Sequence, residues 1–402
     1  MLKDLNFMTH SVSDFNEGFQ LIDQDLHQLA RNQLKQTIQQ SIMIDFEQHM
    51  HYRKHERSAD RSDYRNGYRT RSLYTSFGVI KDINVPRSRY KQFIPSAFER
   101  YKQVHNTVNN GILKMFLMGV STRKVSDVLQ ALLGFTVSAS HVSRVTKKLD
   151  HEVKSYLNRP LKNDFVYLFL DGIHLKVRHI SKSVNRVVLV AYGIRKNGVR
   201  ELISFKVGKS EGKGTWSSFL NDLKIRGLSG SALELIISDG AKGLWAAAAE
   251  VYPFVEHQLC WAHKLRNVAN CLSAKHQKQC VDQARSIYQS TSVKLALKRF
   301  REWEERWKTS APKAVLCLKR DLDNLLPFLN CPPGHHKKIR TTNVIERQFR
   351  ELRRRFRVMG SFPDTSCMHR MVYALFSYYN TRFKRNNMRI KQIQQTHEKQ
   401  AA

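Results

Sequence analysis

Three acidic residues that are far apart in the chain stand next to the ends of predicted elements. Asp171 ends the apolar run FVYLFLD, Asp239 ends the run LELIISD, and Glu346 falls in the first turn of a predicted helix. Cleavage or transfer at a phosphodiester requires charge to be neutralised on both the attacking and the leaving oxygen, which two Mg²⁺ ions about 3.5 to 4 Å apart achieve. Mg²⁺ prefers oxygen ligands and needs few from the protein, because it keeps waters and takes phosphate oxygens. The three acids are therefore candidate catalytic residues and metal ligands for Mg²⁺, or for Mn²⁺ in its place.

Each of these acids also has a purely structural interpretation. Both aspartates are followed by glycine, a pair common in turns, and Asn343 with Glu346 fits a capping box, in which the glutamate accepts a hydrogen bond at the helix start. The chemical interpretation is favoured because all three acids occur on compatible elements of a strongly basic chain. The chain has 68 Lys and Arg against 34 Asp and Glu, a net charge of +34. Such an excess points to a polyanionic partner.

The segments around the acids predict a mixed α/β core. FVYLFLD is a continuous apolar run suited to a strand covered on both faces, and VVLVAY and LISFKV flank Asn197-Gly198, a favoured hairpin turn. We expect these strands to form an antiparallel meander, followed by a helix after Gly214, the strand LELIISD, a helix through LWAAAAEVY and a short strand over 254–259. This order is that of a ribonuclease-H-like core, in which the first and fourth strands are parallel neighbours. Their terminal carboxylates then emerge at one edge of the sheet, where α/β folds place their sites.

A basic and mostly helical region precedes this core. Residues 51–102 contain 13 Lys or Arg against 5 Asp or Glu, with a predicted hairpin around Phe77-Gly78. Residues 108–150 predict two helices, because Ser121 and Ser138 can cap them and Gly134 can end the first. The pattern fits a helix-turn-helix, with an ordinary helical hairpin as the alternative. The candidate DNA-binding residues of this region are Arg123, Lys124, Arg144, Lys147 and Lys148.

The predicted late helix, starting at Thr342 or Asn343, carries a column of arginines beside Glu346. Residues 337–357 contain 9 Lys or Arg against 2 acids. A solvated cationic face is the alternative, but this density favours an anionic partner. The expected core-facing stripe is Ile345, Phe349, Leu352 and Phe356, and the candidate DNA-binding residues on the adjoining face are Arg350, Arg353 and Arg357.

Cys260 and His263 form a Cys-x-x-His pair, which could supply two zinc ligands. The next cysteines, Cys271 and Cys280, stand at irregular spacing on a predicted helix, so we favour a structural role for the pair, packed behind the acidic site. The apolar stripe at 3,4,3,4 spacing over residues 293–307 predicts helix core rather than a platform for base stacking. No GxxxxGK[ST] or GxGxxG sequence occurs, so ATP or dinucleotide use is not expected.

The chain shows neither an apolar run of about 18 residues that could cross a bilayer nor a charged-then-apolar leader. We therefore expect a cytoplasmic, nucleoid-associated protein with no membrane partner. The predicted divisions are an N-terminal helical segment (1–50), a basic DNA-binding region (51–160), the first part of the core (161–263), a helical insertion (264–335), the final core helices bearing Glu346 (336–380) and a basic tail (381–402).

Several segments resemble the Mutator-type transposases of bacterial insertion sequences, from about Ser58 to about Lys384. They are SDYRNGYRTRSLYTSFGVIKDINVPRSR, GVSTRKVSDVLQALLG with SASHVSRVTKKLD, FLDGIHLKVR, SDGAKGLWAAAAEVYPFVEHQLCWAHKLRNV and TTNVIERQFRELRRRFRVMGSFP. The last two are highly specific. The first 50 residues and the C-terminal tail match weakly, so nothing is transferred to them.

The resemblance implies a DDE transposase with a ribonuclease-H-like core and a helical insertion. Asp171, Asp239 and Glu346 match the family's triad, and Cys260 and His263 match its Cys-x-x-His signature. The implied activity is Mg²⁺-dependent strand cleavage and strand transfer on double-stranded DNA, at terminal inverted repeats and at a target, by a homodimer. Two rivals remain open: a related nuclease or resolvase that only hydrolyses DNA, and a DNA-binding regulator without chemistry.

Overall fold

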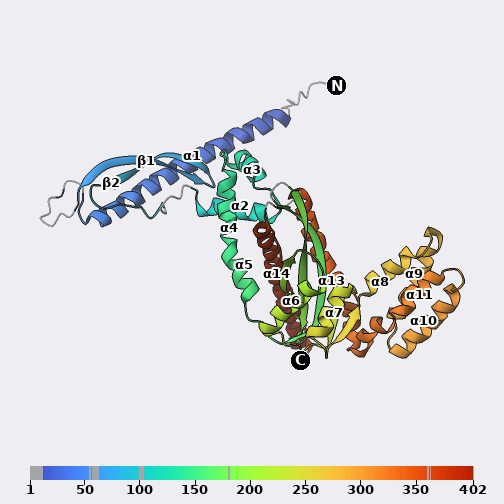
Figure 1. The fold of residues 1–402 in the computed structure, drawn as a ribbon. Coiled ribbons are helices and arrows are strands. Elements are labelled where there is room, and N and C mark those ends of the chain that lie inside the picture. Colours follow the sequence, from blue (N-terminus) through green and yellow to red (C-terminus); the bar gives the residue numbers. More distant parts are fainter. Residues whose placement is uncertain are drawn as a thin grey trace, which may run out of the picture. The chain divides into compact units, whose positions relative to one another are not determined.

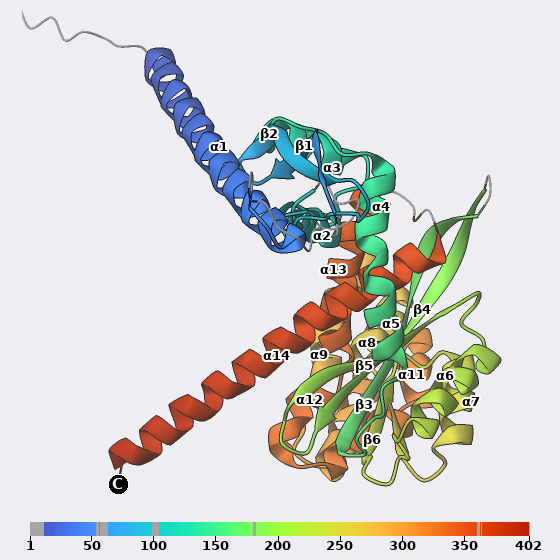
Figure 2. The same cartoon turned by 90° about the vertical axis from the view of Figure 1, so that its left-hand side faces the viewer.

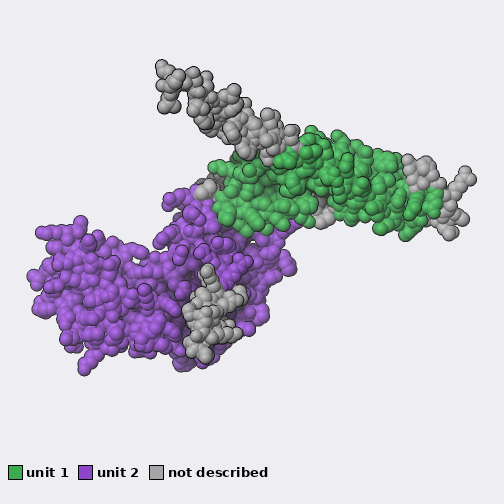
Figure 3. Space-filling model, turned by 180° about the vertical axis from the view of Figure 1, so that it is seen from behind, with its two compact units in different colours: residues 1–146 green, residues 147–402 purple. Residues whose placement is uncertain are grey.

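The chain forms two compact units, which are described separately (Figure 3). They comprise residues 1–146 and residues 147–402. This computed structural model describes residues 12–53, 56, 63–98, 104–179, 182–359, 362 and 364–401.

The first unit begins with a long helix packed on a two-stranded antiparallel sheet. Its contacts bury Phe46 of the helix with Ile80, Ile83 and Val85 of the second strand. Ile83 and Val85 share a face by alternation, and Ile80 joins them because the pairing register shifts between Ile80 and Ile83. The two strands pair antiparallel up to Thr75 and Gly78, so the predicted hairpin around Phe77-Gly78 is present. The elements are α1 (Val12–Met50), β1 (Arg65–Thr75) and β2 (Gly78–Ser88).

Three short helices complete this unit around a core of their own. The predicted caps are present: Ser121 Oγ accepts from Lys124 N at 3.3 Å, and Ser138 Oγ accepts from His141 N at 3.1 Å. Gly134 ends the middle helix in the left-handed conformation, with φ at 71°. The helices are α2 (Asn106–Leu117), α3 (Lys124–Leu133) and α4 (Ala139–Lys147).

The last predicted helix of the 108–150 region, with Val142, Val145 and Leu149 on its expected buried face, is divided only at Lys148, whose backbone keeps helical angles (φ −58°, ψ −25°). The sequence pattern extends it through Leu149, but α4 ends at Lys147 and Leu149 begins a separate helix, α5 (Leu149–Asn158), in the second unit. Leu149 and Val153 are nevertheless buried. The apolar spacing that suggested one continuous helix therefore serves two helices joined at Lys148.

The second unit is built on a five-stranded mixed sheet with the order β5-β4-β3-β6-β7. The first three strands in the sequence form an antiparallel meander, and β6 and β7 run parallel to β3. The sequence of strands and helices is the one predicted above, and β3 and β6 are parallel neighbours as expected. The elements are β3 (Phe165–His179), β4 (Lys182–Arg195), β5 (Arg200–Gly208), α6 (Lys213–Ile225), β6 (Leu235–Ser238), α7 (Lys242–Val251) and β7 (Glu256–Leu259).

Helices cover both faces of this sheet, which explains the apolar character of residues 165–170 at the start of β3 (Figures 1 and 2). Leu168 and Leu170 pack with α6 and α7 in one core cluster. Phe169, between them in the sequence, contacts Tyr192, which in turn contacts Phe383 of the C-terminal helix. The helices on this second side are α5, α13 (Asn343–Met359) and α14 (Thr365–Ala401), which continues into the predicted tail.

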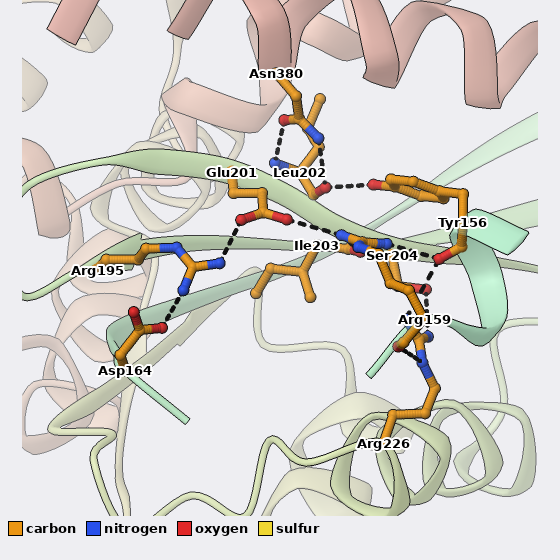
Figure 4. A network of polar contacts seen from close by, with 10 residues as sticks. All are labelled: Tyr156, Arg159, Asp164, Arg195, Glu201, Leu202, Ile203, Ser204, Arg226 and Asn380. Atoms are coloured by element: carbon orange, nitrogen blue, oxygen red, sulfur yellow. Dashed lines mark hydrogen bonds and ion pairs between the residues drawn. The ribbon is translucent and has the colours of Figure 1, made fainter. Parts of the chain in front are cut away.

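The edge strand β5 is held by polar contacts from neighbouring elements (Figure 4). Asn380 of α14 accepts from Leu202 N at 2.8 Å and donates to Leu202 O at 3.0 Å. Glu201 lies between Arg159 at 2.7 Å and Arg195 at 2.6 Å. An exposed edge strand offers unpaired backbone groups to other chains. These contacts satisfy part of that edge within the same unit.

A helical segment follows β7 and returns to the sheet at α13. Its predicted apolar stripe is core: Phe300, Trp303 and Trp307 are buried. Its elements are α8 (Trp261–Asn270), α9 (Ala274–Tyr288), α10 (Val293–Trp307), α11 (Pro312–Arg320), η1 (Asp323–Leu325), η2 (Pro327–Asn330), η3 (Pro333–His335) and α12 (His336–Ile339). Within the described residues, the structure contains no helix with the length and apolar character needed to cross a bilayer.

Candidate active site

Asp171 and Asp239 are brought together by the parallel pairing of β3 and β6. The last paired residues of these strands are Phe169 and Ile237. Asp171 stands two residues further along β3, and Asp239 stands two residues after Ile237, directly after the end of β6. β7 continues this register, because Ser238 pairs with Leu259, and Cys260 N donates to Ser238 O at 2.7 Å. The two aspartates and the Cys-x-x-His segment therefore lie side by side at the edge of the sheet formed by the carboxyl ends of β6 and β7.

Asp171 does not end its strand, contrary to the sequence-based expectation. β3 continues to His179 and pairs with β4 along this extension, so Asp171 lies in the middle of the strand. The apolar run stops at Asp171 because the partner β6 stops there, whereas the hairpin with β4 goes on. Alternation places Asp171 on the face of Phe169, the side that α13 and α14 cover.

The start of α13 is attached to the end of β7. The Sγ atom of Cys260 accepts from Thr342 N at 3.2 Å and lies 3.3 Å from Thr342 Oγ1, and Trp261 N donates to Arg340 O at 3.1 Å. Cys260 and Thr342 are both buried. These contacts fix the first turn of α13, and with it Glu346, at the edge that carries the two aspartates.

His263 interacts with both Glu346 and Asp171. Its Nε2 atom lies 3.3 Å from Glu346 Oε1, and Arg266 approaches the same oxygen at 3.8 Å. The hydrogen bond from His263 to Cys260 is the largest influence that raises the pKa of His263, to about 9, with the charges of Cys260, Asp171 and Glu346 adding to it. His263 is therefore a cation at neutral pH that faces carboxylates from two different elements.

Asp171 is the most perturbed carboxyl group of this site. Burial, and then the negative charge of Asp239, raise its pKa to about 7, while the positive charge of His263 opposes the rise. Asp239 has one oxygen engaged in a turn, where Oδ1 accepts from Ala241 N at 3.0 Å. The turn interpretation thus holds for Asp239 and fails for Asp171, which is in continuous strand. A perturbed acid at a sheet edge is a functional-site candidate.

Comparisons with known proteins identify the family. The family model described as "Transposase, Mutator family" matches residues 8–386. The chain belongs to the Mutator family of transposases. It is 34% identical over 345 residues to the transposase for insertion sequence element ISRM5 of Rhizobium meliloti, covering 86% of each protein.

Two further relatives of this Mutator-family transposase have similar coverage. The transposase for insertion sequence element IS256 in transposon Tn4001 of Staphylococcus aureus is 33% identical over 77% of this chain and 79% of that protein. The transposase for insertion sequence element IS406 of Burkholderia multivorans is 36% identical over 77% of this chain and 80% of that protein.

Glu211 is a fourth carboxylate of the transposase that the sequence analysis missed. It stands in the loop between β5 and α6 and packs against Gly172, where any side chain would collide with its carboxylate. His174 Nε2 lies 3.2 Å from Glu211 Oε2. Burial and the charge of Asp239 raise the pKa of Glu211. The available signal was its place between a predicted strand and a helix, but no motif marks it.

The donor chemistry of the transposase site fits Mg²⁺. Among the residues that the structure describes, no three His, Cys, Asp or Glu side chains are grouped closely enough to hold a metal ion. However, Glu346 Oε1 is buried and makes no hydrogen bond, although His263 lies 3.3 Å away. The pKa of Asp171 is raised by burial and then by the charge of Asp239, and a bound cation would oppose both effects. Carboxylate oxygens on three elements are ligands that this ion prefers.

The candidate DNA-binding arginines of α13 are exposed side chains. Ile345, Phe349 and Leu352 are buried as predicted, whereas the side chain of Phe356 lies outside the described residues. Glu351 pairs with Arg354 and Arg355 at 2.8 Å. In the part of the chain that is described, no ion pair involves the three predicted arginines, Arg350, Arg353 and Arg357.

The predicted DNA-binding residues of the first 150 positions are also exposed. Arg123 and Lys124 precede or begin α3, and Arg144 and Lys147 lie on α4, with Lys148 directly after it. Val142 and Val145 of α4 are buried. The basic face of α4 is therefore free of the apolar contacts that hold the helix.

Proposed function

We propose that this insertion-sequence transposase cuts and transfers DNA strands at a single acidic site formed by Asp171, Asp239 and Glu346. The observation that carries this proposal is the convergence of three elements on one edge of the sheet. The parallel register of β3 and β6 aligns the two aspartates, and His263 contacts Glu346 while its charge acts on Asp171. The element order and strand pairing support a ribonuclease-H-like core for this site.

The residues of this site would have separate roles at the scissile phosphodiester. Asp171, Asp239 and Glu346 would hold Mg²⁺, with Mn²⁺ able to replace it. When bound, the metal lowers the pKa of the attacking water or 3′-hydroxyl and neutralises charge on the leaving oxygen. Asp171 must be ionised to act as a ligand, and the cationic His263 favours that ionised form. His263 also holds Glu346 in place through their contact at 3.3 Å.

The basic surfaces provide the DNA contacts in this proposal. The exposed arginines of α13 follow Glu346 along one face of the helix and would bind phosphates near the site. The helix-turn-helix interpretation of α3 and α4 would place the exposed residues Arg144 and Lys147 on the terminal inverted repeats. Two copies acting on two element ends would form the homodimer.

The acidic site is tested by Asp239→Asn. Purified protein is incubated with element-end DNA and Mg²⁺ or Mn²⁺, and nicks are mapped at nucleotide resolution. The variant should lose cleavage by at least about 10³-fold while keeping DNA affinity, because a neutral amide is a poor ligand for Mg²⁺. Asp323→Asn, at an exposed position in η1, is the matched control. Cleavage that survives in Asp239→Asn would show that the acids are misassigned.

Strand transfer separates the proposal from hydrolysis alone. End DNA that is already cut to expose 3′-hydroxyl groups is supplied with target DNA. A transposase joins these ends to the target, and the joined product disappears in Asp171→Asn and Glu346→Gln. If the wild type cuts DNA but never joins pre-cut ends, the nuclease or resolvase interpretation replaces ours.

A further inference from the structure

A polar cavity of about 570 Å³ opens directly beside Asp239. It lies between the first turn of α7 and the helices α8 and α11, and Asp239 and Cys260 form part of its wall. Its volume falls within the range of about 300 to 1,000 Å³ that is typical of ligand sites. The cavity is therefore continuous with the proposed acidic site and large enough for a ligand of its own.

The lining of this cavity combines the groups that bind a nucleotide. Lys242 and Arg320 are exposed cations suited to phosphate oxygens. Arg320 also pairs with Asp321 at 3.3 Å, at an exposed position where this contact can be exchanged for a phosphate. Asn267 and Asn324 are exposed amides, which present both a donor and an acceptor to the edge of a base. Trp245 adds an aromatic ring. The charged lining residues comprise three cations, Lys242, Lys264 and Arg320, and two acids, Asp239 and Asp321, which leaves an excess of one positive charge.

Trp245 is held as a fixed platform. Its ring stacks on His257 with 3.7 Å between ring centroids and 9° between planes. His257 is itself held by Ser238 Oγ, 2.8 Å from its Nε2 atom, and its burial lowers its pKa to about 3, so the ring stays neutral. The uncharged ring of His257 thus covers one face of Trp245, so a ligand would stack on the other face.

The class of ligand that would fill this cavity follows from the group that binds at Asp239. If a scissile phosphate is bound there, as in the function proposed above, the adjoining nucleotide of the same strand is within reach of the cavity. A base in a duplex is stacked on its neighbours, so it can enter only when it leaves the stack. An aromatic ring compensates for the lost stacking because every base has a π face.

We propose that this cavity binds one nucleotide next to the scissile phosphate, with its base stacked on Trp245 and its phosphates beside Lys242 and Arg320. This inference rests on the proposed function, because the cut strand delivers the nucleotide. It assigns to the loop before α7, and to α8 and α11, a role in holding the DNA strand that the acids alone do not provide.

The test measures binding rather than cleavage. Element-end duplexes carry a short mismatched bubble across the mapped nick, so that no base pair has to be broken, and an abasic site replaces each bubble nucleotide in turn. Affinities are measured by fluorescence anisotropy without divalent metal. One abasic position should weaken binding by the wild type about 5- to 150-fold. Trp245→Ala should weaken binding of the intact bubble by the same factor and should no longer respond to that abasic position.

Two further variants control for folding and for the loss of any aromatic ring. Trp245→Phe retains a stacking ring and should retain the response to the abasic position. Phe254→Ala removes an aromatic side chain that is 99% exposed between α7 and β7, and it should behave as wild type. Thermal unfolding of each variant confirms that it is folded.

Three outcomes would contradict the inference. If no position responds in the wild type, the cavity holds no base. If the response persists in Trp245→Ala, the base stacks elsewhere. If Trp245→Phe loses the response while folded, stacking is not the interaction. None of these depends on the acids, so misassigned acids and an empty cavity are separate results. A wild type that binds no end DNA would contradict the proposed function as well.

Discussion

Asp171 carries a charge that the folded protein disfavours in the absence of a cation. Its pKa is raised from 3.8 to about 7 by burial and by Asp239. Between about pH 4 and pH 7 the folded protein therefore keeps a proton that the unfolded chain has released, and stability falls as the pH rises through this window. Asp171→Asn removes the charge. We expect it to raise the free energy of unfolding at pH 8 in a chelator by an amount on the order of 2 kcal/mol, with little gain near pH 4.

This expectation is checked by urea unfolding followed by tryptophan fluorescence. All five tryptophans lie in residues 147–402, so the signal reports the unit that contains Asp171. Asp323→Asn, at an exposed position, should change stability little at either pH. If Asp171→Asn destabilises the protein at pH 8, the ionised carboxylate has favourable partners that the raised pKa does not reflect.

A substitution at Gly172 tests whether cleavage depends on the position of the Glu211 carboxylate. A methyl group at Gly172 would collide with the Glu211 carboxylate, whereas one at Gly214 meets nothing within 4 Å. Gly172→Ala should therefore displace Glu211 and reduce cleavage about 10- to 100-fold, because small misplacements near reacting groups are costly. Gly214→Ala should leave cleavage unchanged. Initial rates and DNA affinity are compared for both variants.

Glu211→Gln distinguishes the charge of Glu211 from its shape. The amide fills the same space against Gly172, so a loss of cleavage similar to that of Gly172→Ala would assign the effect to the missing carboxylate. Full activity in Glu211→Gln, together with a defect in Gly172→Ala, would instead show that only the backbone near Asp171 was disturbed.

At the scale of elements, the contact between α14 and the edge strand β5 stabilises the sheet. Asn380 makes two hydrogen bonds to the backbone of Leu202, and both residues are partly or fully buried. Asn380→Ala removes the side-chain acceptor of the Leu202 N–H, whereas Leu202 O keeps the hydrogen bond from the Tyr156 hydroxyl. We expect a loss of about 1 to 3 kcal/mol in the free energy of unfolding, measured by urea denaturation. Thr381→Ala, at the next and exposed position, should cost much less.

The elements that local patterns specify were predictable, and those that depend on distant contacts were less so. The five strands and the helix of Glu346 followed from apolar runs, the Asn197-Gly198 turn and a 3,4 stripe. The extension of β3 beyond Asp171 did not, because it depends on pairing with β4. The apolar spacing across Lys148 was predictable, since Val142, Val145 and Leu149 are all buried and Lys148 keeps helical backbone angles.

The same distinction between local patterns and distant contacts applies to the residues of the candidate site. Acids at element ends could be found because their types and positions are visible in the sequence. The attachment of Thr342 to Cys260 could not be found, because it joins residues 82 positions apart. Glu211 was missed for a related reason: its contact with Gly172 depends on how the β5–α6 loop folds over the sheet. Local spacing proposes the chemical groups, and packing decides which additional groups surround them.

At the scale of the whole molecule, the net charge of +34 makes DNA affinity depend on salt. Because of this excess, many Lys and Arg side chains outside the site could also contribute to DNA affinity. The α13 arginines are distinguished by their position, since they follow Glu346 along one helix and are exposed. If they bind phosphates of the cut strand, their loss should change the salt dependence more than the loss of equally exposed cations elsewhere.

Replacing Arg350, Arg353 and Arg357 together by alanine tests this. Each duplex phosphate released should lower the slope of log affinity against log salt by about 0.9, so the triple variant should lose up to about 2.7. The matched control replaces three exposed cations of α10, Lys294, Lys298 and Arg301, and should leave the slope nearly unchanged. Equal changes in both variants would mean that the arginines act only through the general field of a basic protein, and the α13 face would then lose its assignment as a strand-binding surface.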